Sequence, residues 1–151
     1  MSQKQNVLKE IRSAKRAHIA WVGRAELLAK GFPVTEDQAP LSHAECEFGT
    51  WYLKAGAALK EIDSFKAIDA PHKALHDAYA DIYKALFKQK NVSFFGRMIG
   101  KGAKIKEQNK PLIADKLRTL ESASNEVVKH LDTFENMLTQ LPDAQVDALF
   151  S

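Results

Sequence analysis

Apolar residues recur at intervals of three and four positions along most of the chain, a spacing typical of amphipathic helices. The first stripe predicts a helix over residues 6–30, and Gly31 directly after it is a common residue at a helix end. We find no alternating apolar and polar run long enough to predict a strand. The stripe consists of Leu8, Ile11, Ala14, His18, Trp21, Ala25 and Leu28.

Two further helices have start signals. Residues 42–45, Ser-His-Ala-Glu, match a capping box and predict a second helix from about residue 43. Gly49 and Gly56 weaken this helix, so we expect it to be short or kinked. Asp69, followed two positions later by a proline, predicts a third helix that extends to about residue 89.

The last helix is predicted over residues 111–141, between two prolines. Its apolar positions alternate in steps of four and three, which suits packing at a shallow angle. The sequence therefore predicts a single all-α domain over residues 1–151, folded as an antiparallel four-helix bundle. The tail, residues 143–151, is expected to fray. The apolar seam is Ile113, Leu117, Leu120, Ser124, Val127, Leu131, Phe134, Leu138 and Leu141.

Charge is concentrated in one segment. The net charge of +3 is too small to predict nucleic-acid binding. Residues 84–110, however, contain eight basic side chains and a single acidic one, and residues 91–110 form a basic connection before the last helix. One cysteine excludes an internal disulfide framework. We see neither a signal peptide nor an apolar run of membrane-spanning length, so we expect a cytoplasmic protein.

Three histidines and the cysteine occupy unusual positions. His18 lies within the first apolar stripe, His72 and His76 share one face of the third helix, and Cys46 lies in the first turns of the second. Burying these groups together is costly unless a ligand satisfies them, and imidazole with thiolate suits Zn²⁺. Cys46 lies near a helix N-terminus, where the positive end of the helix dipole would favour its thiolate over its thiol form. Hydrogen-bonded core histidines and a small apolar cysteine are the alternative, and the pattern alone leaves both open.

The surroundings of these four residues are also predicted. Three aromatic residues, Trp21, Trp51 and Tyr52, are expected to pack around the site. The other histidines, His43 and His130, are expected at the surface. Three carboxylates lie close enough in sequence to orient a ligand imidazole, namely Glu47, Asp77 and Asp81.

Three segments of the chain resemble the chemoreceptor zinc-binding domain, abbreviated CZB. They are residues 17–21 (Ala-His-Ile-Ala-Trp), residues 46–52 (Cys-Glu-Phe-Gly-Thr-Trp-Tyr) and residues 72–76 (His-Lys-Ala-Leu-His). The family is marked by the same motifs in the same order, and the resemblance covers about residues 10–88. It implies a helical bundle whose Zn²⁺ is held by three histidines and one cysteine. By position these ligands are His18, Cys46, His72 and His76. The family also implies a homodimer.

Enzymatic activity is not expected. The segment His72-Lys-Ala-Leu-His76 has Lys73 in the place of the catalytic Glu of His-Glu-x-x-His metalloproteases. Four protein ligands would also leave no open position on the metal for water. Glycine-rich phosphate loops and nucleophile elbows are not found either.

Two functions remain from different classes. The resemblance implies a regulatory module that reports zinc occupancy or the oxidation state of Cys46 to a signalling protein in trans, such as a diguanylate cyclase or a chemoreceptor. The alternative is a helical interaction protein with a purely structural zinc, which uses the basic segment to bind an acidic partner or a membrane surface. A solvated lysine-rich connection, with its aromatic residues packed onto the bundle end, is the simpler interpretation of that segment, and a membrane surface is not favoured as its partner.

Overall fold

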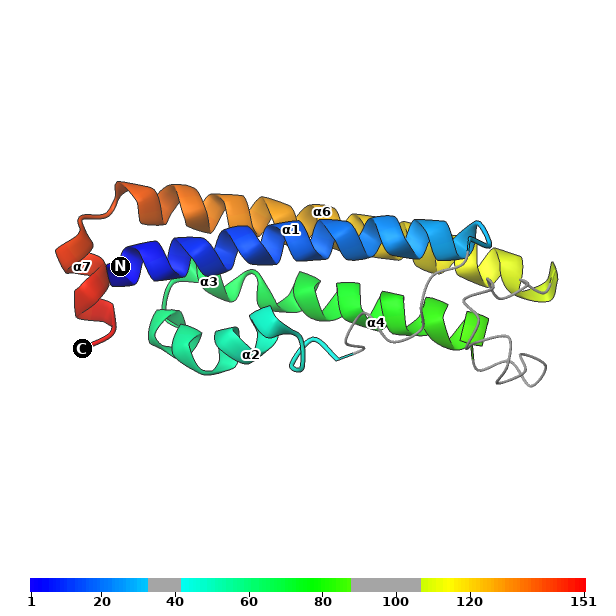
Figure 1. Ribbon diagram of the computed structural model, residues 1–151, viewed down its shortest axis with the longest axis horizontal. Coiled ribbons are helices and arrows are strands. Elements are labelled where there is room, and N and C mark those ends of the chain that lie inside the picture. Colours follow the sequence, from blue (N-terminus) through cyan, green and yellow to red (C-terminus); the bar gives the residue numbers. More distant parts are fainter. Residues whose placement is uncertain (33–41, 88–106) are drawn as a thin grey trace.

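The computed structural model describes residues 1–32, 42–87 and 107–151, and within these ranges the chain forms helices and turns without a strand. In these ranges three long helices dominate, and three short α-helices and two 3-10 turns lie between and after them (Figure 1). The predicted basic connection of residues 91–110 lies largely outside the described residues. The elements are α1 (Gln3–Ala29), α2 (Glu47–Leu53), the 3-10 turn η1 (Ala55–Leu59), α3 (Asp63–Lys66), α4 (Asp69–Phe87), the 3-10 turn η2 (Glu107–Asn109), α6 (Lys110–Gln140) and α7 (Asp143–Leu149).

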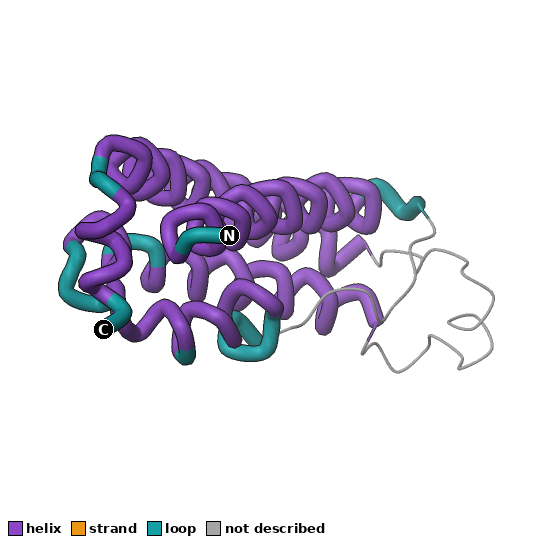
Figure 2. The backbone as a smooth tube through the Cα atoms, turned by 60° about the vertical axis from the view of Figure 1, so that its left-hand side comes forward, coloured by secondary structure: helices purple, strands orange, loops and turns teal. Residues whose placement is uncertain are grey.

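The elements form an up-and-down bundle with α6 packed against both α1 and α4. Helices α1 and α4 run in one direction, and α6 returns antiparallel to them (Figure 1). The fourth side is occupied by the chain of short elements from α2 to α3, seen below α1 in the same view and again in Figure 2. The predicted all-α fold is thus confirmed, but the second of the four predicted helices is broken into short elements.

The long helices form where the apolar stripes predict them. Ser2 caps α1, because its hydroxyl accepts a hydrogen bond from the Gln5 amide while the Gln5 side chain accepts one from the Ser2 amide. Helix α1 therefore begins a few residues earlier than predicted. Gly31 follows the helix with φ of 82°, a backbone conformation that favours glycine. In α6 the central seam residues Leu120, Val127, Leu131, Phe134 and Leu138 have no exposed side-chain surface.

The predicted start of the second helix is wrong. The residues of the expected capping box form turns, and α2 begins only after Cys46, whose side chain takes the N-cap position. Lys54 then ends α2 with φ of −100° and ψ of −87°, outside the helical region. Gly56 lies against the core, where an added Cβ would stand 2.8 Å from the Phe65 ring. The chain therefore winds through short turns on this side, because the backbone leaves the helical conformation at Lys54 and approaches the core closely at Gly56.

The C-terminal tail is ordered, contrary to the expectation that it frays. Residues of α7 pack against α1, and Val146 is completely buried. Lys4 on α1 also donates hydrogen bonds to the carbonyl oxygens of Thr139 and Leu141 at 3.0 and 2.7 Å, which satisfies acceptors at the end of α6. Burial of an apolar side chain and these bonds offset the entropy of ordering a short tail.

Ion pairs connect the outer surfaces of α1 and α6. Arg12 lies 2.6 Å from Glu135, and Lys15 lies 2.5 Å from Asp132 and 3.5 Å from Glu135. Such half-exposed pairs contribute little stability each, so their main consequence is that two cationic side chains of α1 face α6.

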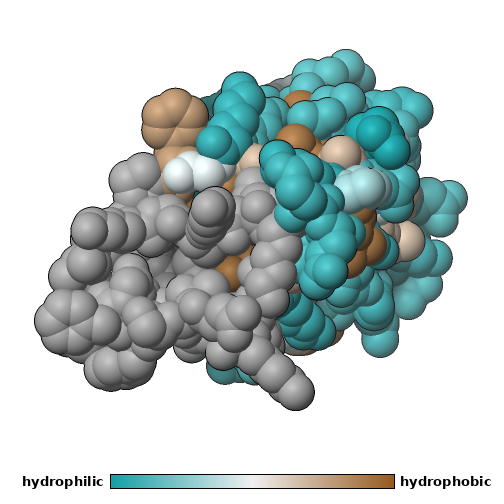
Figure 3. Space-filling model, turned by 90° about the vertical axis from the view of Figure 1, so that its right-hand side faces the viewer, coloured by the Kyte–Doolittle hydropathy of each residue, from teal (hydrophilic) through white to brown (hydrophobic). Residues whose placement is uncertain are grey.

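The surface of the described bundle is mostly hydrophilic. Figure 3 shows this at the end where α1 and α4 finish and α6 starts, with a few apolar residues between the polar ones. Among the described residues, no helix has both the length and the apolar character needed to cross a membrane.

Candidate metal centre

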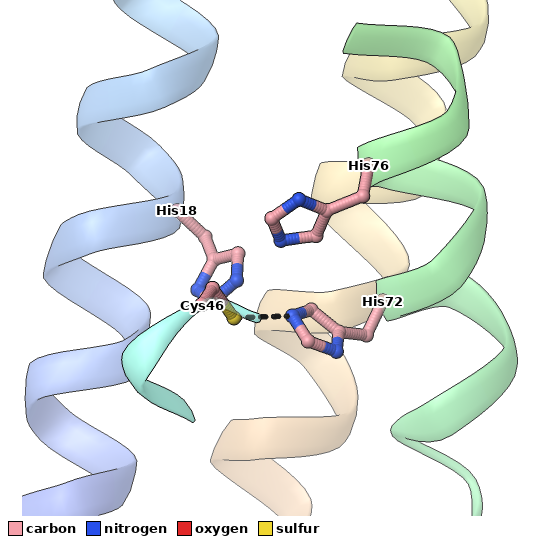
Figure 4. A group of neighbouring side chains, drawn as sticks. All are labelled: His18, Cys46, His72 and His76. Carbon is pink, nitrogen blue, oxygen red and sulfur yellow. Dashed lines mark hydrogen bonds between the residues drawn. The ribbon is translucent and has the colours of Figure 1, made fainter. Parts of the chain in front are cut away.

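All four predicted ligand residues meet at one level of the bundle. His18 comes from the middle of α1, Cys46 from the N-cap of α2, and His72 and His76 from the first half of α4. One nitrogen or sulfur atom of each lies within 4.8 Å of those of the other three. Figure 4 shows the three imidazoles and the thiol directed toward a common centre. None of the four side chains is more than 2% exposed.

The orientation of His18 fits a metal ligand. Its Nδ1 lies 2.6 Å from the carbonyl oxygen of Ala14, and because a carbonyl only accepts, Nδ1 carries the proton. The lone pair is then on Nε2, which is buried and has no hydrogen-bond partner among the described residues. An imidazole that donates to a backbone carbonyl from one nitrogen and offers the other is the usual arrangement of a metal-bound histidine.

The thiol of Cys46 is held by the backbone of its own turn. Its Sγ accepts a hydrogen bond from the Gly49 amide at 3.1 Å and lies 3.4 Å from the His43 carbonyl oxygen. The turn is so tight that a Cβ on Gly49 would stand 1.7 Å from that same oxygen. Glycine at this position therefore lets the turn close and brings its amide to the sulfur.

The separations between ligand atoms fit Zn²⁺. Bond lengths of about 2.0 Å to nitrogen and 2.3 Å to sulfur give edges of about 3.3–3.5 Å in a tetrahedron. Cys46 Sγ and His72 Nε2 are 3.4 Å apart, which is such an edge. The widest pairs, up to 4.8 Å, would close by roughly 1 Å around an ion. Three imidazoles and one thiolate are also a donor set that zinc prefers.

Burial keeps the ligand residues uncharged. Loss of hydration lowers the pKa of His18, and it lowers the pKa of His72 to about 2 with help from the neighbouring imidazoles. Both shifts favour the neutral imidazole, which is the form that binds a metal. Burial raises the pKa of the Cys46 thiol, although the amides of Gly49 and Phe48 oppose it. Burial thus outweighs the predicted stabilisation of the thiolate by the helix N-terminus, and a bound cation is needed for the thiol to lose its proton.

Aromatic rings enclose the centre. Trp21 lies edge-on to His18 with ring centroids 4.7 Å apart, and Phe48 packs on His72 at 5.2 Å. Trp51 and Tyr52 lie further out, against the Phe65 ring at 6.0 and 4.3 Å. The predicted aromatic shell is therefore present, but Phe48, not singled out from the sequence, contacts the ligands more closely than two of its predicted members.

Two of the three predicted carboxylate partners, Asp77 and Asp81, lie away from the ligands, whereas Glu47 lines a small cavity beside His18. Asp77 pairs with Lys73 at 2.6 Å and Asp81 with Lys116 at 3.0 Å, both on the outside of the bundle. The Ala14 carbonyl takes the orienting role for His18 instead, a group that side-chain patterns do not reveal. His43 is half-buried, with its ring 5.7 Å from that of His72 but outside the group of four.

His130 is likewise separate from the centre. It lies on α6, where it stands 3.5 Å from Glu126 one helical turn away. The prediction that it takes no part in the site agrees with this position.

A comparison with protein families gives one finding. Residues 18–83 match the family model described as the chemoreceptor zinc-binding domain, a stretch that begins at His18 and contains all four residues of the centre. No curated protein and no solved structure matches the chain.

We expect the substitution Gly49→Ala to weaken zinc binding by about tenfold or more, because the added methyl group forces the Cys46 turn apart. Competition with a chromophoric chelator measures the affinity. Gly23→Ala is the control, since Gly23 lies on α1 with open space around it and should bind zinc as the native chain does. Equal affinities for the two variants would contradict this account of the turn.

We also expect the zinc-free protein to lose stability as the pH falls from 7 to 5. In the unfolded chain His18 and His72 take up protons below about pH 6.5, whereas burial keeps them neutral in the folded chain. For His72 this should cost about 1.4 kcal/mol of unfolding free energy per pH unit below that value, and His18 adds to the loss in the same direction. Urea unfolding in the presence of a chelator measures the slope. It should be smaller in His72→Gln and stay unchanged in His130→Gln, and a flat profile would show that the histidines are not held neutral.

Proposed function

We propose, from the premise that residues 18–83 form a chemoreceptor zinc-binding domain, that this protein is a bacterial regulatory module rather than an enzyme. It reports zinc occupancy or the oxidation state of Cys46 to a signalling partner of the chemotaxis or cyclic-di-GMP type. The observation that carries the proposal is the buried group of three histidines and one cysteine, with its cysteine on a short helix at the edge of the bundle.

The centre joins parts of the bundle that differ in their anchoring. The three histidines stand on α1 and α4, which both pack along α6. Cys46 stands on α2, a helix of seven residues whose buried positions are Phe48 and Gly49. Phe48 itself packs on the imidazoles of His18 and His72, with ring centroids 6.0 and 5.2 Å away. The docking of α2 therefore depends on the ligands both through the thiol and through its apolar anchor.

Loss of zinc would act on α2 first. A bound zinc in a protein contributes on the order of 10 kcal/mol, similar to the whole stability of a small domain. Without it, the Nε2 atom of His18 is a buried acceptor without a partner, and separating the ring from Phe48 lets water reach it. Movement of α2 away from α1 is thus the response that relieves this cost with the least disruption of the long helices.

Oxidation of Cys46 would have the same result. A two-electron oxidant such as hypochlorous acid would transfer its oxygen atom to the Cys46 thiolate and leave as chloride, and the resulting sulfenic acid is a poorer ligand that would release the ion. Burial alone raises the pKa of the Cys46 thiol, so a bound ion is what keeps the sulfur in the reactive thiolate form. The bound thiolate is therefore the form through which an oxidant would be sensed.

The remaining features of the proposal come from the family and from composition. We propose a homodimer in the cytoplasm that binds its signalling partner in trans. A second function, an interaction protein with a structural zinc and a basic segment at residues 91–110 that binds an acidic partner, differs from the first in one respect. In that case zinc occupancy does not change the position of α2 and is not used as a signal.

Hydrogen exchange separates the two functions. We expect removal of zinc by a chelator to speed amide exchange over residues 43–59 at least about tenfold, while the core of α6 changes little. Cys46→Ala should show fast exchange with or without zinc, and His130→Ala should behave as the native chain. Exchange over residues 43–59 that does not respond to zinc would contradict the signalling role and favour the structural one.

A further inference from the structure

A small cavity lies between α1 and the start of α2, against the metal centre. Its volume is about 70 Å³, and its lining includes His18 and Phe48, which are buried, together with Glu10, Ser13 and Glu47, which reach toward solvent. A space of this size holds a few water molecules or a partly hydrated cation. The larger grooves between α4 and α6 and along the N-terminal half of α1 touch none of the four ligand residues.

The centre needs a polar route to solvent. Its four side chains are at most 2% exposed, and Trp21 and Phe48 cover the imidazoles. A divalent cation cannot pass between apolar side chains without losing its hydration at a large cost. Since the cavity reaches from His18 to half-exposed and exposed carboxylates, it offers a path along which oxygen atoms can replace water molecules one at a time.

The two carboxylates are available for this role. The side-chain carboxylates of Glu10 and Glu47 form no hydrogen bond or ion pair with another residue in the described part of the chain. The cationic neighbours of Glu10 on α1, Arg12 and Lys15, are directed to carboxylates of α6. Arg16 donates a hydrogen bond to the Ser13 hydroxyl of the lining at 3.2 Å, so the mouth of the cavity carries two carboxylates with one guanidinium nearby.

We infer that this cavity is the portal through which Zn²⁺ reaches and leaves the centre, with Glu10 and Glu47 as transient ligands at its mouth. The portal sets the rate of zinc exchange and leaves the final four-ligand site to set the affinity. The inference rests on the zinc centre and does not require the signalling role.

A filled cavity tests the portal. Ala17 lines it, so Ala17→Leu should slow both zinc association and chelator-driven release by a common factor of about five or more, with Kd nearly unchanged. Stopped-flow measurement of intrinsic fluorescence follows association, because Trp21 lies beside His18. Ala20→Leu is the matched control, with the same substitution at an exposed position of the same helix outside the cavity lining.

The charge at the mouth gives a second, independent test. We expect Glu10→Gln to lower the association rate constant about threefold to tenfold at low ionic strength and less at high salt. Glu26→Gln, on the same helix but outside the cavity lining, should match the native rate. Native exchange rates in both Ala17→Leu and Glu10→Gln, with one zinc still bound, would overturn the portal. A native chain that binds no zinc would overturn the centre and the portal together.

Discussion

The burial of three imidazoles and a thiol at one level of the bundle is the constraint on which the rest of the structure depends. Polar groups removed from water must find partners, and the Nε2 atom of His18 has none among the described residues. The four buried groups lie where a single Zn²⁺ would bind all of them at once. The fold and the centre are thus coupled, because the packing that buries these four groups leaves the Nε2 atom of His18 unsatisfied unless an ion is bound.

The long helices and α2 depend on the metal centre to different degrees. Helix α6 contacts both α1 and α4 along an apolar seam that owes nothing to the metal. Helix α2 has only a few buried residues, and its main anchor lies on the ligand rings. The ligands thus connect a frame of long helices to one side of the molecule where the backbone is broken into short elements. The proposed switch requires such a division between a stable frame and a short element attached to the metal ligands.

Much of this could be predicted from the sequence, and the exceptions share a physical cause. The stripes of α1 and α6 follow from periodicity, because long helices with one apolar face leave a regular pattern, whereas the set of four ligands came from the resemblance to the chemoreceptor zinc-binding domain. The start of α2 could not be predicted, since it depends on a contact between the Gly49 position and the His43 carbonyl that forms only in the folded turn. The order of α7 and the partner of His18 were missed for the same reason. Val146 needs the surface of α1, and Ala14 contributes a backbone oxygen that no side-chain motif records.

Metal content is the most direct test of the central claim. Mass spectrometry of the untagged protein should find one zinc per chain, and Cys46→Ala and His72→Ala should each bind it weakly or not at all. His130→Ala, which changes a histidine outside the centre, should retain the full amount. Little or no metal in the native chain, even after zinc is added, would contradict the account and leave four buried polar side chains without an explanation.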